Sequence, residues 1–94
     1  MRIHWKEQFK EDYKRLETTL KDPKPFRKAL YKAVSVLQRG DDLSKIFPVN
    51  RIVPLGEGWY DCYIYSDIAM IYKIREKSVQ LYAVGKASDL YKRR

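Results

Sequence analysis

The sequence has very few of the residues from which most enzyme and metal sites are built. Its 94 residues include one histidine, His4, and one cysteine, Cys62. These counts exclude an intramolecular disulfide and a cysteine-rich zinc site, and they argue against a histidine relay. Gly56 and Gly58 belong to a turn, and no phosphate-cradling glycine loop is present. We therefore expect no metal and no cofactor, and the residues do not favour a metabolic enzyme.

Long apolar runs are absent as well. No segment approaches the ~20 apolar residues of a membrane span, and residues 1–6 lack the apolar core of a signal peptide. The absence of disulfides from so small a chain fits a reducing, intracellular setting. We expect a cytoplasmic protein without a membrane partner, in which Cys62 is a small buried strand residue and not a reactive thiol.

Positive charge is what the sequence has in excess. Lysine and arginine number 20 against 12 acidic residues, which gives a net charge of +8. Such a charge attracts polyanions, of which nucleic acid is the commonest, but it attracts an acidic protein equally well. Hydrophobic residues make up 45% of the chain, enough for the core of one domain over residues 1–94.

Residues 59–74 predict a β-hairpin at the middle of a sheet. In the first half, side chains facing the core alternate with side chains facing the other way, as in a half-buried strand. The inward set is Tyr60, Cys62 and Ile64, and the outward set is Asp61, Tyr63 and Tyr65. Residues 68–72 are almost wholly apolar, as in a central strand covered on both faces. Ser66 and Asp67 supply the turn between them.

Two amphipathic helices are predicted before the hairpin. The first has an apolar stripe and an opposite face of mixed charge, which indicates a solvated surface. Its stripe consists of Phe9, Tyr13, Leu16 and Leu20. Asp22 is expected to cap the second helix, with Pro23 at its first position, and Gly40 is expected to end it. The second helix is expected to bury Phe26, Leu30, Ala33, Val34 and Leu37.

Short strands account for the other apolar segments. They are predicted at residues 2–5, at residues 51–55, where Pro54 favours a sheet edge or a strand end, and at residues 79–84. The loop between residues 41 and 48 is expected to be anchored on the core by Leu43, Ile46 and Phe47. The last four strands are joined by short turns and should pair antiparallel. The predicted fold is α+β, with an N-terminal strand and an αα-hairpin packed on one face of a twisted, mainly antiparallel sheet.

The outward tyrosines of the hairpin are the first candidates for binding. Tyr63 and Tyr65 would share one face of the sheet with cations. Such a surface suits RNA, because aromatic rings stack on splayed bases while Lys and Arg hold phosphates. An ordinary sheet with amphipathic tyrosines at its rim explains the same pattern equally well. The residues alone leave both interpretations open.

Five segments carry a resemblance to a known family. They are FKEDYKRL at residues 9–16, the leucine and glycine that end the second helix, GWYD at 58–61, DIAMIYKI at 67–74 and VGKASDLY at 84–91. In this order they resemble the RelE/ParE superfamily of bacterial toxin–antitoxin toxins, and within it the YafQ-like branch. The similarity covers nearly the whole chain, and the last segment matches the family's ending of a glycine, a polar pair and a terminal aromatic residue.

The resemblance implies a RelE-like fold and an mRNA interferase that enters the ribosomal A site and cuts the bound codon. In that reaction the ribose 2′-hydroxyl attacks the adjacent phosphate. The reaction calls for a base near the hydroxyl, cations on the phosphate and an acid for the leaving 5′-oxygen, and it needs no metal. The ribosome supplies much of the positioning, so a small site can suffice.

The chain departs from the family pattern at the histidines. YafQ-like enzymes carry them at the positions that align with Asn50, Tyr63 and Ala87, and only Asp67 and the final aromatic, Tyr91, keep their character. Other RelE-like toxins use lysines, arginines and a C-terminal tyrosine instead. On that pattern the expected catalytic residues are Tyr91, Lys86, Asp67 and Tyr63. The expected RNA-binding residues are Asn50, Arg51, Tyr65, Lys73, Lys92 and Arg93.

Each of these roles has a plainer alternative. Tyr91 could be the acid, the base or a stacking ring, and as a base it would need Lys86 and residues 92–94 to lower its pKa from about 10. Asp67 could be simply a turn residue, and Tyr63 could pack on the sheet.

Two other functions stay open on the sequence alone. One is a ParE-like inhibitor of DNA gyrase that cuts nothing, which the missing histidines favour and the ending of the chain opposes. The other is a catalytically inactive relative that keeps antitoxin binding. The resemblance implies a cognate antitoxin whose acidic, helical C-terminal part covers the basic surface, the ribosome and mRNA as further partners, and operator DNA bound only through the antitoxin complex.

Overall fold

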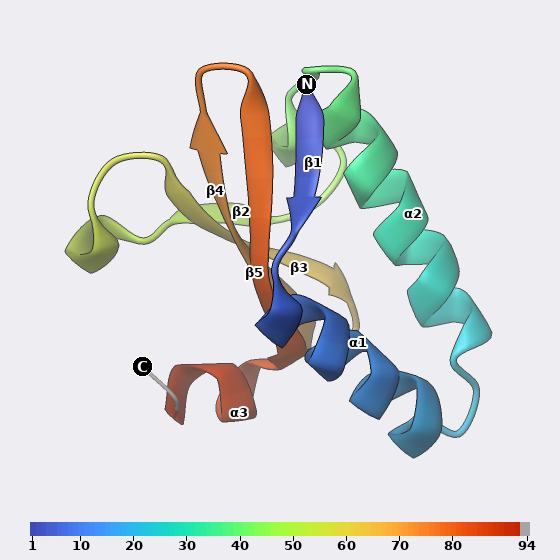
Figure 1. Cartoon of the computed structure of the whole chain (residues 1–94). Helices are drawn as coiled ribbons and strands as arrows, with labels where there is room; N and C mark the ends of the chain where they lie inside the picture. The colour runs from blue at the N-terminus through green and yellow to red at the C-terminus, as the bar shows by residue number, and fades with distance from the viewer. Residues whose placement is uncertain (93–94) are drawn as a thin grey trace.

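The computed structural model of the chain describes residues 1–92. Within them a five-stranded sheet has α1 and α2 on one face and the short α3 against one end of the other (Figure 1). The strands are β1 (Arg2–Trp5), β2 (Val49–Arg51), β3 (Trp59–Tyr65), β4 (Ile68–Arg75) and β5 (Ser78–Lys86). The helices are α1 (Glu7–Thr19), α2 (Lys24–Gln38) and α3 (Ala87–Lys92), with 3₁₀ turns at Leu43–Lys45 and Val53–Leu55.

The strands lie in the order β1-β5-β4-β3-β2. The last four pair antiparallel, as their short connections predict, and β1 pairs parallel with β5, with Ile3 opposite Val79. The predicted α+β class, the helical hairpin on one face and the interior position of the β3–β4 hairpin are confirmed. None of the helices within residues 1–92 has the length and apolar character that crossing a membrane requires.

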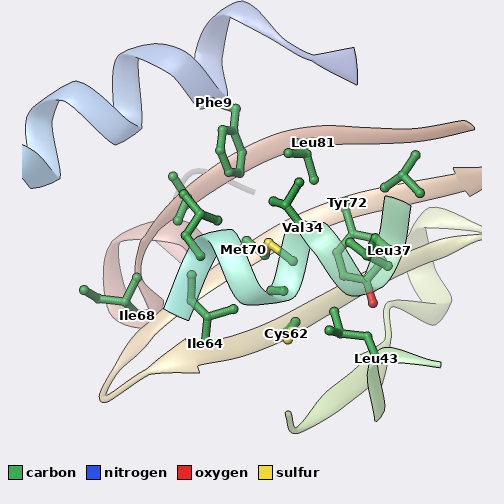
Figure 2. Packing of buried hydrophobic residues seen from close by; sticks show 14 of the residues in the cluster. Phe9, Val34, Leu37, Leu43, Cys62, Ile64, Ile68, Met70, Tyr72 and Leu81 are labelled. Atoms are coloured by element: carbon green, nitrogen blue, oxygen red, sulfur yellow. The ribbon is translucent and has the colours of Figure 1, made fainter. Parts of the chain in front are cut away.

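The face of the sheet under α1 and α2, called the inner face here, holds the main core (Figure 2). Phe9, Phe26 and Leu30 are fully buried, as the helical stripes predict. From the sheet, Cys62 and Met70 pack against them. Burial raises the pKa of the Cys62 thiol to about 12, which fits an inert apolar role for this residue.

The ends of α2 differ slightly from the prediction. The residue before the helix is Pro23 and not Asp22, because the Pro23 carbonyl already accepts the first helical hydrogen bond, from Arg27 at 2.9 Å. Asp22 still assists, since its carboxylate accepts from the Lys24 N–H at 3.2 Å. Gly40 ends the helix as predicted, with a φ of 78° that favours glycine.

Two predictions for the segment between α2 and β3 are wrong. The strand lies at Val49–Arg51, and Val53–Leu55 forms a 3₁₀ turn, because Pro54 lacks the N–H that a strand ladder needs. The edge position that Pro54 indicates is confirmed, since β2 ends the sheet. Ile46 is 46% exposed and anchors nothing, whereas Leu43 is buried and Phe47 packs on the core.

Candidate functional site

The other face of the sheet, called the outer face here, carries a second and smaller apolar cluster. Its buried members are Ile52, Ala69, Ile71 and Leu90. Leu90 belongs to α3 and is 1% exposed, so it fixes this short helix on the sheet. The Ala87 N–H at the start of α3 donates to the Asp67 carbonyl at 2.9 Å. The turn after β3 and the apolar cluster thus hold α3 at both ends.

Next to Leu90, the hydroxyl of Tyr91 donates a hydrogen bond to Oδ2 of Asp61 in β3. The other carboxylate oxygen of Asp61 accepts from Nδ2 of Asn50 at 3.2 Å, because β2 and β3 pair these residues directly. Tyr63 lies two residues along the same face of β3, and its side chain also interacts with Tyr91. We call Asn50, Asp61, Tyr63 and Tyr91 the tyrosine–carboxylate cluster.

Asp61 and Tyr91 differ in their access to solvent. Asp61 is 6% exposed, whereas Tyr91 is 38% exposed and forms the outer side of the cluster. Desolvation first, and then the hydrogen bond to Asp61, raise the pKa of Tyr91 above its usual value. Tyr91 therefore keeps its proton at neutral pH, and the lowered pKa that a free phenolate base requires is not found.

The hydrogen bond from Tyr91 to Asp61 fixes what the tyrosine offers to a ligand. A phenol has one proton and lone pairs on its oxygen. Because its own proton is directed at Asp61, the phenol can take part in proton transfer by accepting a second proton on its oxygen, beside the contact with Tyr63. A proton taken up there can be balanced by transfer of the phenol's own proton to Asp61. The pair can thus work as a relay in which the carboxylate is the final acceptor.

Two of the predicted cations lie elsewhere. Lys86 and Lys92 line a hollow of about 450 Å³ between α1 and the end of β5, together with Arg15 and Asp89. Asp12 lines the same hollow, and Tyr91 is not among the residues that line it. Arg93, the other predicted RNA-binding residue of the C-terminal segment, lies outside the described residues.

The remaining predicted residues are spread over the sheet. Asp67 stands in the turn between β3 and β4, where its carbonyl receives the α3 bond, and Tyr65 is 39% exposed beside it. Arg51 pairs with Tyr60, whose side chain packs on the inner core. Arg51 also lines a separate hollow of about 270 Å³. Lys73 lies over the ring of Trp59 on the outer face, 5.3 Å from its centre. The structure brings Asn50, Tyr63 and Tyr91 together but leaves Arg51 apart from them.

The sequence did not single out two carboxylates that the structure buries. Asp61 was expected as an outward residue of the strand and as the end of the GWYD segment, with no functional role, and its tyrosine partner comes 30 residues later. Asp12 is 1% exposed and accepts hydrogen bonds from the Val84 N–H at 3.1 Å and from Gln8 at 2.9 Å. A signal for Asp12 exists, because it lies three residues after Phe9 and four before Leu16, on the buried stripe.

Residues 1–92 bring together no group of three His, Cys, Asp or Glu side chains that could hold a metal ion. The tyrosine–carboxylate cluster contributes a single carboxylate, and the lone histidine lies in β1 at the other edge of the sheet. What the site offers is therefore proton transfer and hydrogen bonding from protein groups.

Comparison with known proteins gives one family. Residues 1–92 match the model of a family described as the bacterial toxin of type II toxin–antitoxin system, YafQ. No curated protein sequence matches the chain.

Solved structures share the fold. The chain is similar to a chain of the Escherichia coli DinJ–YafQ complex, with 22% identity and a TM-score of 0.81 over 97% of this chain and 99% of that one. A metal-bound toxin from Helicobacter pylori has 24% identity and a TM-score of 0.79, covering 96% and 98%. A chain of the Methanococcus jannaschii RelB–RelE antitoxin–toxin complex has 13% identity and a TM-score of 0.74, covering 96% of each chain.

Proposed function

The chain belongs to the YafQ family of bacterial type II toxin–antitoxin toxins, and from this premise we propose that it is a ribosome-dependent mRNA endoribonuclease that works without histidine. The observation that carries the proposal is the hydrogen bond from the solvent-accessible Tyr91 to the nearly buried Asp61. It gives the outer face a proton-accepting pair where the family histidines are missing.

In the proposed reaction the 2′-oxygen of the ribose bonds to phosphorus and the bond from phosphorus to the 5′-oxygen breaks. The 2′-hydroxyl proton passes to the oxygen of Tyr91, and the phenol proton passes to Oδ2 of Asp61. The leaving 5′-oxygen takes a proton from water, and the product ends are a 2′,3′-cyclic phosphate and a 5′-hydroxyl. Asn50 holds the other carboxylate oxygen and keeps Asp61 in place.

Conservative substitutions in the cluster test the relay. In Tyr91→Phe the ring stays but the hydroxyl is lost, and in Asp61→Asn the hydrogen-bond acceptor stays but the proton acceptor is lost. We expect both to lower ribosome-dependent cleavage by roughly 10²–10⁴-fold, the usual contribution of general acid–base catalysis. Primer extension on mRNA from a reconstituted translation reaction would measure the rate and place the cuts.

Tyr31→Phe is the matched control, since it removes a hydroxyl from an exposed tyrosine of α2, on the opposite side of the sheet from the cluster. It should cleave at the wild-type rate. A Tyr91→Phe protein that also cleaves at the wild-type rate would rule out the relay and leave Tyr91 with a stacking role at most.

The proposal includes a cognate antitoxin as partner. Two of the similar solved structures are toxin–antitoxin complexes, DinJ–YafQ and RelB–RelE. The net charge of +8 fits an acidic antitoxin segment lying over this chain. Operator DNA would be bound only through that complex, whereas the ribosome and mRNA are partners of the free toxin in the cytoplasm.

Gyrase inhibition of the ParE kind is the second candidate, and the histidine-free positions Asn50, Tyr63 and Ala87 favour it. Two assays on the same protein separate the candidates. Co-sedimentation with ribosomes and codon-phased cuts support the endoribonuclease. Loss of gyrase supercoiling with intact mRNA supports the alternative.

A further inference from the structure

Two aromatic rings and two lysines lie together on the outer face, near the start of β3. The ring centres of Trp59 in β3 and Tyr82 in β5 are 4.5 Å apart. Lys73 lies 5.3 Å from the centre of the Trp59 ring, and Lys6 lies 5.5 Å from that of Tyr82. We call these four residues the lysine–aromatic patch.

The sheet explains how residues so distant in sequence meet. Lys73 is opposite Trp59 on one side and opposite Gln80 on the other, so all three share the outer face. The register between β4 and β5 shifts at this point, since Ile71 pairs with Ala83 and Tyr72 with Leu81. Tyr82 is the extra residue of this irregularity, and a bulge of this kind redirects a side chain. The bulge places Tyr82 on the outer face beside Trp59.

The patch and the tyrosine–carboxylate cluster form one continuous surface. Trp59, Tyr63 and Tyr82 all pack against the small cluster that includes Leu90 of α3. Trp59 and Asp61 are alternate residues of one strand and are therefore about 7 Å apart along it. A chain lying along the outer face of β3 would pass both.

The two lysines are held in place, yet their charges are not neutralised by an acid. No ion pair within residues 1–92 involves Lys6 or Lys73. Lys6 is exposed, and Lys73 and both rings are half-buried. Cation–π contacts of this kind contribute about 0.5–1 kcal/mol at exposed sites, too little to compete with a phosphate partner.

We infer that the lysine–aromatic patch is a second binding area for single-stranded RNA, which holds the nucleotides next to the scissile phosphate. Lys6 and Lys73 would turn from the rings to two backbone phosphates, and the ring surfaces they uncover would take a base. The combination favours RNA over an acidic peptide, because a peptide uses the lysines but has no base to stack on the rings. The inference deepens the proposed endoribonuclease function and rests on it for the identity of the RNA.

Salt dependence of binding gives the sharpest test, and it can be made without any cleavage. A fluorescent oligoribonucleotide of about ten nucleotides with 2′-O-methyl riboses cannot be cut, because its nucleophile is blocked. Its affinity would be measured by anisotropy over a range of salt concentrations. Each phosphate contact on a single strand adds about 0.7 to the slope of log affinity against log salt.

For Lys6→Gln/Lys73→Gln we expect about tenfold weaker binding and a slope smaller by about 1.4, the value of two lost phosphate contacts. The matched control is Lys28→Gln/Lys32→Gln, which removes two solvent-exposed charges from α2, on the opposite side of the sheet from the patch. Its slope should equal that of the wild type. An equal loss in both double variants would overturn the inference, since net charge alone would then explain the binding.

Stacking is tested separately through Trp59. In a Trp5→Phe background Trp59 is the only tryptophan, and we expect the oligonucleotide to quench its fluorescence. Poly-glutamate, an acidic peptide, should not do so. Equal quenching by poly-glutamate, or no quenching by RNA, would overturn the assignment of this patch to RNA.

The cleavage assay keeps the two proposals apart. If the wild type binds the oligonucleotide with the lysine-dependent slope but cuts no mRNA on ribosomes, the proposed function fails and the patch remains an RNA-binding surface. If the wild type cuts mRNA and the lysine variant binds and cuts normally, the assignment of RNA binding to the patch is wrong, whereas the proposed function is retained.

Discussion

The two faces of the sheet are built in opposite ways. The inner face is covered by α1 and α2 and is dry, with Phe9, Phe26 and Leu30 fully buried. Within residues 1–92 the six-residue α3 covers one end of the outer face, which carries tyrosines, a tryptophan, lysines and the nearly buried Asp61. The same five strands thus carry the main core on one side and the candidate site on the other. Substitutions on the two faces should therefore separate unfolding from loss of function.

The largest effect is expected on the inner face. Phe9→Ala removes a fully buried ring and leaves a cavity between α1 and the sheet. The free energy of unfolding should fall by about 3–5 kcal/mol. Urea unfolding would measure it, with Lys73→Ala on the outer face as a control that loses one cation–π contact and should change stability by less than about 1 kcal/mol. Equal losses in the two proteins would contradict the difference between the faces.

A buried polar group should matter nearly as much as a ring. Asp12→Ala leaves the Val84 N–H unpaired between α1 and β5. We expect a loss of about 2–3 kcal/mol in the free energy of unfolding, because the lost hydrogen bond is to a charged and buried acceptor. Arg15→Gln is the control, since Arg15 is largely exposed and its ion pair with Asp12 should contribute less than about 1 kcal/mol. A larger loss for Arg15→Gln would contradict this ranking.

Leu90, which anchors α3 on the sheet, should affect stability more locally than Phe9 or Asp12. Leu90→Ala removes the one side chain of α3 that is fully buried on the outer face. We expect the free energy of unfolding to fall by about 2 kcal/mol, the low end for such a substitution, because α3 can detach without exposing the inner core. Amide hydrogen exchange should accelerate in residues 87–92 and not in β4. A uniform acceleration across the sheet would show that the outer face carries stability too.

The smallest effect is confined to alkaline pH. The pKa of Tyr91 is raised in the folded state, so above about pH 10 the unfolded chain loses this proton first. The contribution of Tyr91 to stability is therefore full below that pH and declines as the pH rises through the folded-state pKa. The difference in urea midpoint between wild type and Tyr91→Phe should shrink from about pH 8 to about pH 11. A constant difference would contradict the assignment.

The inner face was the part of the fold that the sequence could predict. Helical spacing of Phe9 and Leu16 and the alternation through Cys62 depend only on local periodicity. Pro54 was placed in a strand, although the lack of an N–H made a turn the better choice. The parallel pairing of β1 with β5 joins residues 76 positions apart, such as Ile3 and Val79, and no local pattern reports it.

The candidate site was predicted less completely, for the same reason. Asn50, Tyr63 and Tyr91 were selected from a resemblance, and the structure brings them together around Asp61, to which the resemblance assigned no role. Asp61 gains its role from burial under Tyr91, and burial of a polar strand residue is decided by what the distant chain places over it. Lys86 was selected from the same resemblance, but it lines the hollow against α1 and is apart from the cluster.

The pairing of β1 with β5 also determines when the sheet can form during translation. β1 is synthesised before β5 and cannot pair with it until residues 78–86 have left the ribosome, and α1 too packs on that later strand. Contacts of such long sequence separation slow folding, and they cannot form vectorially as the chain emerges. A nascent chain therefore carries neither a finished sheet nor a finished outer face. The outer face is therefore complete only after β5 and α3 have been made, and an inhibitor that captures the late-folding chain has that interval in which to act.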